Sequence, residues 1–319
     1  MKRYGNLWEQ VCAPENIRLA HARARRGKCH YKEVVMVDAD PQRYFDEIRE
    51  LLVKKTFKNS EYTVLIKKEG AKEREIWRLP YYPDRIIHHC ILNVLEPILM
   101  KAYIRDTYAA LPGRGIHDGV RRVKAALKNV EDTRYCLKLD VRKFYQSIDH
   151  VALKLRLRRK IKDPNLLWLL DTIIDSAPGV PIGNYTSQHF ANFVLSDLDH
   201  WLKEHQQIRH YFRYCDDLVV LGRDKDSLHR LRRQIADYLQ SELRLEVKGN
   251  WQVFPVAARG IDFLGYRFFH GYTLVRKSIV KRFKRKFRAG EQRALAAYNG
   301  WFKWADTHHL KLVYDWSAK

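Results

Sequence analysis

The stretch RYCDD, residues 213–217, places two adjacent carboxylates inside a strongly basic chain. Apolar residues dominate the flanking segments 208–212 and 218–221, which predicts two β-strands joined at the aspartate pair. Adjacent carboxylates repel each other, so they need a cation or a special setting to be tolerated at the tip of a buried hairpin. The pair therefore marks the segment on which the fold and the chemistry of this chain depend.

Size and charge limit the classes of protein to consider. The chain has 319 residues, 46% of them hydrophobic, which is enough for two or three subdomains around a real core. Lys and Arg number 60 against 37 Asp and Glu, and the formal net charge is +23. Such a surface favours a polyanion as partner, above all nucleic acid. A membrane is not expected, because no apolar run reaches about 18 residues and MKRYGNLWEQ lacks a signal-peptide core.

Cysteine and histidine usage argues against a disulfide framework and against a zinc site. The five cysteines are scattered, with no CxxC pair, at Cys12, Cys29, Cys90, Cys136 and Cys215. A reducing, cytoplasmic setting fits this pattern. The histidine pairs at 88–89 and 308–309 lack ligand spacing and are expected to be ordinary core or surface residues.

The pattern of apolar residues predicts an α+β protein. Expected elements are a hairpin over 61–80, helices over 84–103, 118–130, 147–161, 187–205 and 226–243, strands over 135–141, 210–222 and 261–269, and a basic helical end over 278–311. Asp149 is the expected cap of the third of these helices. The order from 135 to 270 predicts an antiparallel sheet with helices on one face.

A third carboxylate, Asp140, ends the strand predicted over 135–141. If that strand neighbours the 210–222 hairpin, Asp140 converges with Asp216 and Asp217. Hard oxygen ligands at a partly solvated site favour Mg²⁺, and two such ions about 4 Å apart can activate a 3′-hydroxyl and stabilise a leaving pyrophosphate. The competing interpretation is an ordinary Asp-rich turn. The framing by Tyr214 and by the second strand end favours the metal site.

Four segments occur in an order that resembles the successive palm motifs of reverse transcriptases. They are LDVRKFYQSID (139–149), GVPIGNYTSQHFANFVLSDLD (179–199), RYCDDLVVLG (213–222) and FLGYRF (263–268). Residues 214–217 look like the Y-x-D-D tetrapeptide of that family. The resemblance implies an RNA-directed DNA polymerase with a right-hand fold. Its implied parts are an N-terminal basic helical extension (1–60), fingers (61–134), a palm with the active site and primer grip (135–270), and a short basic helical thumb (271–319).

Finer features resemble the reverse transcriptases of diversity-generating retroelements. Ile182 stands where most retroviral and intron enzymes carry Gln, and the stretches 251–269 and 301–310 are also similar to that branch. The resemblance implies that a template-repeat RNA is copied into cDNA with errors at adenines, as in mutagenic retrohoming. It also implies a small basic pentameric accessory variability protein as partner. Cys215 departs from the Met that is frequent in the family, which leaves the error rate open.

Two alternatives remain open. The chain is also compatible with a retron-, group II intron- or CRISPR-associated reverse transcriptase. A non-catalytic RNA-binding protein with a polymerase-like fold is the second alternative, although three intact carboxylates count against it.

The resemblance assigns roles around the catalytic carboxylates. Implied ligands of two Mg²⁺ ions, with Mn²⁺ as a substitute, are Asp140, Asp216, Asp217 and the carbonyl of Val141. The implied dNTP-binding residues are Lys72, Arg74, Arg85, Tyr145, Ile182, Gly183, Gln188 and Lys248. Among these, Tyr145 matches the aromatic that blocks a ribose 2′-hydroxyl, and Lys248 matches a proton donor to pyrophosphate. Cationic fingers are suited to clamp a triphosphate.

Template and primer contacts are implied on both sides of the palm. They comprise Arg114, Ser187, Tyr214, Leu264, Gly265, Lys281, Lys284 and Arg285. The basic thumb segment is suited to follow the phosphates of an RNA–cDNA duplex without reading sequence. Phe283 and Phe287, four residues apart, are expected in the core rather than as stacking platforms.

Overall fold

The structure is a computed structural model that describes residues 3–69 and 72–314, without the side chains of residues 69, 72, 292–294 and 311. The chain divides into two compact units. Unit 1 comprises 1–103, 142–199 and 240–245, and unit 2 comprises 104–141, 200–239 and 246–319.

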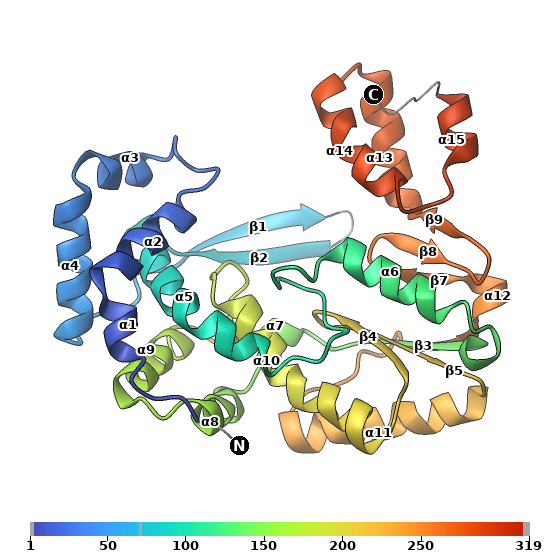
Figure 1. The fold of residues 1–319 in the computed structure, drawn as a ribbon, viewed down its shortest axis with the longest axis horizontal. Coiled ribbons are helices and arrows are strands. Elements are labelled where there is room, and N and C mark those ends of the chain that lie inside the picture. Colours follow the sequence, from blue (N-terminus) through green and yellow to red (C-terminus); the bar gives the residue numbers. More distant parts are fainter. Residues whose placement is uncertain (1–2, 70–71, 315–319) are drawn as a thin grey trace. The chain divides into compact units, whose positions relative to one another are not determined.

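Unit 1 is mainly helical and contains one two-stranded sheet (Figure 1). Its helices are α1 (Trp8–Cys12), α2 (Pro14–Ala24), α3 (Lys32–Ala39), α4 (Pro41–Val53), the π-helical turn η1 (Tyr81–Arg85), α5 (Ile86–Met100), α7 (Phe144–Ser147), α8 (His150–Lys160), α9 (Pro164–Ile174) and most of α10 (Ser187–His200). The side chain of Asp149 accepts a hydrogen bond from the Ala152 amide at 2.8 Å and caps α8, which confirms the predicted cap. The apolar helix α5 supplies much of the buried core of this unit.

The predicted hairpin of unit 1 is confirmed. Strand β1 (Thr63–Glu69) pairs antiparallel with β2 (Lys72–Arg78), in a register that runs from Thr63 opposite Arg78 to Glu69 opposite Lys72. Figure 1 shows the hairpin as a long two-stranded ribbon. Val64, Leu65 and Ile66 of β1 are exposed, so both faces of this strand present apolar side chains to the surface.

Unit 2 contains the predicted antiparallel sheet, in the strand order β4-β5-β3-β6. Its strands are β3 (Tyr135–Asp140), β4 (His210–Tyr214), β5 (Asp217–Gly222) and β6 (Gln252–Pro255), and its helical elements include α6 (Ile116–Ala126), the 3₁₀ turn η2 (Glu131–Thr133), the π-helical turn η3 (Trp201–His205) and most of α11 (Lys225–Leu243). The central strands β3 and β5 are buried along most of their length. A sheet that buries both central strands holds the groups at its strand ends in fixed positions.

A second, three-stranded sheet corrects the prediction of one strand over 261–269. Strand β7 (Ile261–Phe263) turns back into β8 (Tyr266–Phe268), which pairs with β9 (Thr273–Val275). Leu264 and Gly265 form the turn, with φ angles of +53° and +85°. Positive φ at both central residues is the geometry of tight hairpins. The sequence did not indicate this turn, because a bulky apolar residue such as Leu264 rarely adopts a positive φ.

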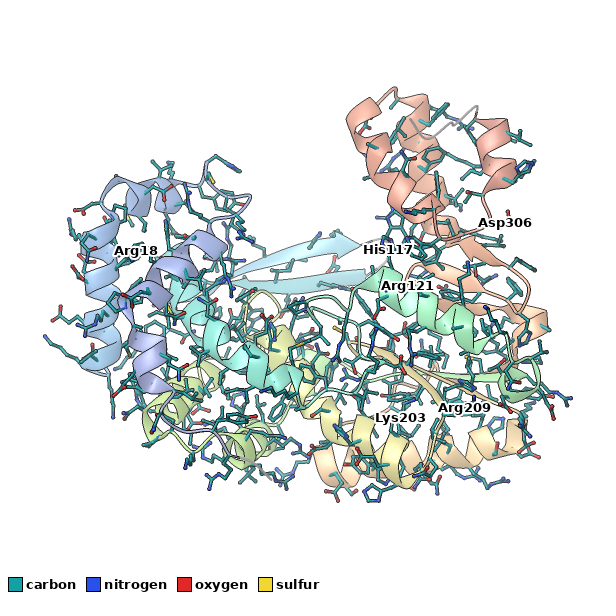
Figure 2. All side chains as sticks on the ribbon, viewed as in Figure 1. Arg18, His117, Arg121, Lys203, Arg209 and Asp306 are labelled. Carbon is teal, nitrogen blue, oxygen red and sulfur yellow. The ribbon has the colours of Figure 1, made fainter. Side chains whose placement is uncertain are left out.

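The C-terminal helices pack against this second sheet. They are α13 (Lys277–Arg288), α14 (Gln292–Phe302) and α15 (His308–Val313), and the short α12 (Val256–Arg259) precedes β7. Phe283 is fully buried and Phe287 packs against the same apolar cluster, which confirms their predicted place in the core. His117 of α6, labelled in Figure 2, stacks on Trp304 with ring centroids 5.4 Å apart.

Four histidines are buried among the described residues of unit 1, and three of them lie on α5 and α10. His88 and His89 of α5 and His189 of α10 are at most 5% exposed. Within the described residues, Nε2 of His88, both ring nitrogens of His89 and Nδ1 of His189 have no hydrogen-bond partner. Burial lowers the pKa of His88 and His89 to about 3 and that of His189 to about 4. The pair at 88–89 is therefore core, one of the two settings predicted for it.

These histidines predict acid-sensitive folding. The unfolded chain binds protons at these histidines near pH 6.5, whereas the folded protein does not. Their contribution to the free energy of unfolding is therefore complete above that pH and is lost as the pH falls towards 4. Each histidine that stays neutral in the folded protein lowers the free energy of unfolding by up to about 1.4 kcal/mol for each pH unit below 6.5. Chemical denaturation between pH 7.5 and 5 measures the free energy of unfolding at each pH. This free energy should fall less steeply with decreasing pH for His189→Gln than for wild type. The exposed His30 offers a control, and an equal effect of His30→Gln would contradict this origin.

Candidate active site

Three carboxylates meet at one edge of the four-stranded sheet. Asp140 is the last residue of β3 and lies opposite Asp217, the first residue of β5, in the strand register. Asp216 precedes β5 directly, and its carbonyl accepts a hydrogen bond from the Val141 amide at 3.3 Å. The structure thus brings together the three aspartates singled out in the sequence.

Asp216 and Asp217 are held in a setting that resists their ionisation. Burial, followed by the charge and hydrogen bond of Asp140, raises the pKa of Asp216 to about 7. Burial also raises the pKa of Asp217 to about 6, although the ammonium of Lys138 acts in the opposite direction. Lys138 Nζ lies 3.3 Å from Asp217 Oδ2. Close carboxylates without a compensating cation are expected to share protons in this way.

The donor set fits a hard divalent cation. Oδ1 of Asp217 is buried and has no hydrogen-bond partner among the residues that the structure describes. Within the same residues, no group of three or more His, Cys, Asp or Glu side chains is placed to hold a metal ion by itself. Mg²⁺ suits such an incomplete oxygen set, because it keeps several waters or substrate oxygens in its coordination sphere.

A buried arginine supports the turn between β4 and β5. Arg213 is fully buried, and its Nη1 donates to the carbonyl of Cys215 at 3.0 Å. Cys215 adopts the left-handed conformation with φ +54°, which is uncommon for a residue other than glycine. The backbone of Arg213 also pairs with the segment 106–108, through the Asp106 carbonyl at 2.9 Å and the Tyr108 amide at 3.1 Å. Sequence reasoning did not single out Arg213, although a cation within an apolar strand is itself a signal.

A chain of polar contacts runs from Asp217 to the β7–β8 turn. Lys138 Nζ, besides contacting Asp217, donates to the carbonyl of Asp262. The Arg276 guanidinium donates to the Asp262 carboxylate at 2.6 Å, and the Arg276 amide donates to the Gly265 carbonyl at 2.9 Å. Lys138 was also missed by sequence reasoning. Its position two residues before Asp140, hence on the same face of the strand, could have indicated it.

Lys248 lies beside Asp140. Its Nζ is 3.5 Å from Asp140 Oδ2, and its amide donates to the Asp140 carbonyl at 2.8 Å. The lysine expected to act on pyrophosphate is therefore anchored to the carboxylate cluster by both its backbone and its side chain.

Apart from Ser187, the other residues expected at the template and primer also belong to unit 2. Tyr214 is half-buried, Leu264 is buried, and Arg114 donates from Nη1 to the carbonyl of Ile104 at 2.8 Å. On α13, Lys284 Nζ lies 5.4 Å from the centroid of the Tyr314 ring. Lys281 and Arg285 are exposed on the same helix.

Several residues expected to bind the nucleotide belong to unit 1. The Ile182 carbonyl accepts a hydrogen bond from the Trp77 amide of β2 at 2.8 Å. Gly183 has φ +132°, and a Cβ at this position would lie 2.3 Å from the Trp77 carbonyl oxygen. The close approach that this glycine permits in the structure is to the β2 backbone.

The remaining nucleotide and template residues of unit 1 differ in exposure. Tyr145 is half-buried, and its ring meets that of Phe144 edge-on at 5.5 Å. Arg74 and Gln188 are exposed, and burial lowers the pKa of Arg85. The buried hydroxyl of Ser187 has no hydrogen-bond partner within the described chain. Lys72 lies in β2, and its side chain is outside the described residues.

Comparison with known proteins identifies the class. Residues 66–268 match the family described as reverse transcriptase (RNA-dependent DNA polymerase), and the chain belongs to this family. It is 24% identical over 249 residues to protein YkfC of Escherichia coli K12, which covers 64% of this chain and 65% of that protein. It is 23% identical over 292 residues to the group II intron-encoded protein LtrA of Lactococcus lactis subsp. cremoris, with coverages of 68% and 48%. With the retron Ec73 reverse transcriptase of Escherichia coli it shares 29% identity over 168 residues, with coverages of 47% and 51%.

The chain thus spans about half to two thirds of the length of these curated relatives. Solved structures of similar fold include telomerase from Candida albicans with a fragment of telomeric RNA, at a TM-score of 0.53 and 12% identity over 75% of this chain and 52% of that one. Apo telomerase from Candida tropicalis has a TM-score of 0.51 and 14% identity, over 67% and 48%. These similarities confirm the predicted polymerase fold class. Across the described residues, every helix is too short or too polar to span a bilayer.

The crowded carboxylates are predicted to lower the stability of the fold. A folded-state pKa of about 7 for Asp216, above the ordinary value of 3.8, means that ionisation destabilises the fold as the pH rises from about 4 to 7. Asp216→Asn should therefore melt about 2 °C or more above wild type in EDTA at pH 7.5. The difference should shrink towards pH 4.

Mg²⁺ provides the second arm of this experiment. It should raise the melting temperature of wild type and leave that of Asp216→Asn nearly unchanged, because a ligand stabilises only the state that binds it. Asp237→Asn, an exposed aspartate of α11, serves as control. A lower melting temperature for Asp216→Asn in EDTA would show that the carboxylates do not repel each other.

Proposed function

We propose that this protein is an RNA-directed DNA polymerase that extends a primer 3′-hydroxyl with dNTPs on an RNA template. One observation carries the proposal: Asp140, Asp216 and Asp217 meet at one sheet edge in a chain of the reverse transcriptase family. Charge alone would equally suit an RNA-binding protein. Clustered carboxylates are costly in a basic nucleic-acid-binding chain unless they hold cations.

Two Mg²⁺ ions are the proposed cofactors, with Mn²⁺ as a substitute. Asp140 and Asp216 would be the principal ligands, with Asp217 and the carbonyl of Val141 completing the protein's share. When bound, the ions would lower the pKa of the primer hydroxyl and neutralise the departing pyrophosphate. Lys248, which lies beside Asp140, would give a proton to the pyrophosphate.

The chain's own residues would position the reactants. Tyr145 would exclude a ribose 2′-hydroxyl, and Arg74, with Lys72 and Arg85, would pair with the triphosphate. Ile182, Gly183 and Gln188 would lie under the templating pair. The duplex would contact Ser187, Tyr214, the Leu264–Gly265 turn and the basic face of α13. In this assignment the fingers, palm and thumb keep the boundaries expected from the sequence.

Primer extension tests the proposal. Purified full chain, an RNA template with an annealed DNA primer, dNTPs and Mg²⁺ should give extended product. Asp216→Asn should reduce extension to background, because it removes a principal ligand while keeping the side-chain volume. Asp237→Asn should extend like wild type.

A failure of wild type to extend would first be checked with the cognate RNA and accessory protein added. If extension still failed, polymerase activity would be rejected. The non-catalytic RNA-binding alternative would then be adopted.

The branch within the family is a finer proposal. Ile182 and the stretches 251–269 and 301–310 support a diversity-generating retroelement, whose enzyme would copy a template-repeat RNA and work with a basic pentameric accessory protein in the cytoplasm. The intron-encoded and retron relatives fit the alternative branches instead. A pair of template and variable repeats next to the gene would favour the retroelement.

Ile182→Gln tests the proposed cause of adenine errors. Ile182 offers no side-chain hydrogen bond where Gln would, and its carbonyl contact to Trp77 does not depend on the side chain. The substitution should therefore preserve folding and lower misincorporation opposite template adenine several-fold. Sequencing of cDNA from one template provides the measurement, and errors opposite the other three bases serve as control. Unchanged adenine errors would reject this role of Ile182.

A further inference from the structure

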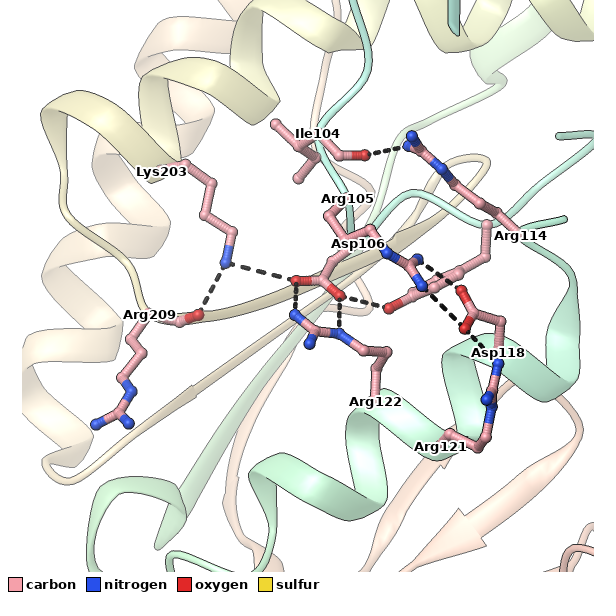
Figure 3. A network of polar contacts seen from close by, with 10 residues as sticks. Ile104, Arg105, Asp106, Arg114, Asp118, Arg121, Arg122, Lys203 and Arg209 are labelled. Carbon is pink, nitrogen blue, oxygen red and sulfur yellow. Dashed lines mark hydrogen bonds and ion pairs between the residues drawn. The ribbon is translucent and has the colours of Figure 1, made fainter. Parts of the chain in front are cut away.

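A second polar network of unit 2 lies on and beside α6, outside the carboxylate cluster. Figure 3 shows two acidic side chains, Asp106 and Asp118, each held by arginines. Asp106 receives two hydrogen bonds from Arg122, at 2.9 and 3.1 Å, and one from the Tyr108 hydroxyl at 2.6 Å. These contacts give Asp106 a structural role, which is to hold the segment beside β4 in place.

Asp118 is arranged differently, because it holds two arginines at once. Arg105 donates to both of its oxygens, at 2.6 and 3.0 Å. Arg121, one turn along α6, donates to Oδ1 at 2.9 Å. These bonds, with Arg105 first, lower the pKa of Asp118. The carboxylate is therefore charged and spans two guanidinium groups.

The two sides of this cluster differ in exposure. The Asp118 side chain is 7% exposed, whereas those of Arg105 and Arg121 are 51% and 63% exposed. The Asp118 carboxylate is thus buried, and the side chains of both arginines reach the surface. Each guanidinium has five N–H donors. Arg105 directs two of its nitrogens, and Arg121 one, to Asp118, so N–H groups remain for a ligand.

This arrangement matches what a phosphate requires. A guanidinium presents a planar fork of donors to phosphate oxygens. Holding a long side chain in place normally costs conformational entropy when a ligand binds. Asp118 holds both arginines before binding. Ion pairs of exposed arginines usually contribute little to the stability of a fold.

The cluster is connected to the strand that leads into the YCDD turn. Arg105 and Asp106 precede Thr107, which forms a parallel bridge with Arg213 of β4. Arg114, the template contact expected from the sequence, donates to the Ile104 carbonyl and so fixes the residue before Arg105. Arg114 therefore supports the backbone of the segment that carries Arg105.

We propose that Arg105 and Arg121, held by Asp118, form a preorganised clamp for the sugar–phosphate backbone of bound nucleic acid. The proposal deepens the proposed function, since it concerns how that substrate class is held. Its test measures binding without metal or dNTP, so a failure of polymerase activity would leave the test intact. Two sources of the phosphates are distinguished, a single-stranded RNA template and an RNA–DNA duplex.

The experiment is fluorescence anisotropy in EDTA with the full chain. The probes are a labelled 20-nucleotide RNA of mixed sequence and the same RNA annealed to a complementary DNA primer, each over a range of KCl concentrations. Arg105→Gln and Arg121→Gln should each weaken binding about 3- to 10-fold and lower the slope of log K against log[salt] by about 0.7 to 1. The probe with the larger loss identifies the strand state that the clamp holds.

Asp118→Asn is the decisive variant, because charge and preorganisation predict opposite results. Removing a negative charge from a cationic surface should strengthen binding by simple electrostatics. If Asp118 acts by holding the arginines, the Asn variant should bind 2- to 5-fold more weakly. Asp237→Asn makes the same charge change at an exposed site of α11 and should bind as tightly as wild type or more tightly.

Two outcomes would overturn the proposal. The first is tighter binding by Asp118→Asn, equal to that of Asp237→Asn. The second is unchanged binding of both probes by the Arg105 and Arg121 variants. If Asp118→Asn melts well below wild type, Arg105→Lys and Arg121→Lys decide instead. They keep the charge and lose the fork, and binding equal to wild type would reject the clamp.

Discussion

The register of β3 against β5 is the constraint on which the rest of the active site depends. It places Asp140 opposite Asp217, with Asp216 one residue away at the turn. A slip of one residue would turn every side chain of either strand to the other face of the sheet. The apolar residues of both strands prevent such a slip because they are buried. Core packing thus determines where three repelling carboxylates meet.

That meeting has an energetic cost, and the surrounding cations offset part of it. Lys138 contacts Asp217, and Lys248 contacts Asp140. The buried Arg213 supports the turn by donating a hydrogen bond to the Cys215 carbonyl. Asp216 has no comparable cationic partner among the described contacts, and its pKa is the more strongly raised. The neighbouring lysines therefore balance only part of the negative charge of the three aspartates, which suits their proposed role as ligands of divalent cations.

The same principle recurs on α6 with the opposite sign. There a buried carboxylate, Asp118, holds exposed arginines in place, whereas at the candidate active site Lys138 contacts a carboxylate. In both arrangements a buried or half-buried charged group fixes the position of a neighbour of opposite charge. Long cationic side chains gain most from this, because they lose the most freedom when a ligand orders them. For a chain of net charge +23, where the cations are held matters more than how many there are.

Local patterns were sufficient for much of this protein. Periodicity predicted the β1–β2 hairpin and the helices around the sheet, and Asp149 was predicted as a cap. The positions of Asp140 and of the Asp216–Asp217 pair at predicted strand ends indicated a shared site if those strands are neighbours. Such signals are local, so they can be read before the chain folds. Other features required the tertiary structure. The turn at Leu264 needs an apolar residue in the left-handed region, which no propensity indicates. The contacts of Gly183 with Trp77, of Lys138 with Asp217 and of Asp118 with Arg105 join residues 13 to 106 positions apart, and only folding decides which side chains meet.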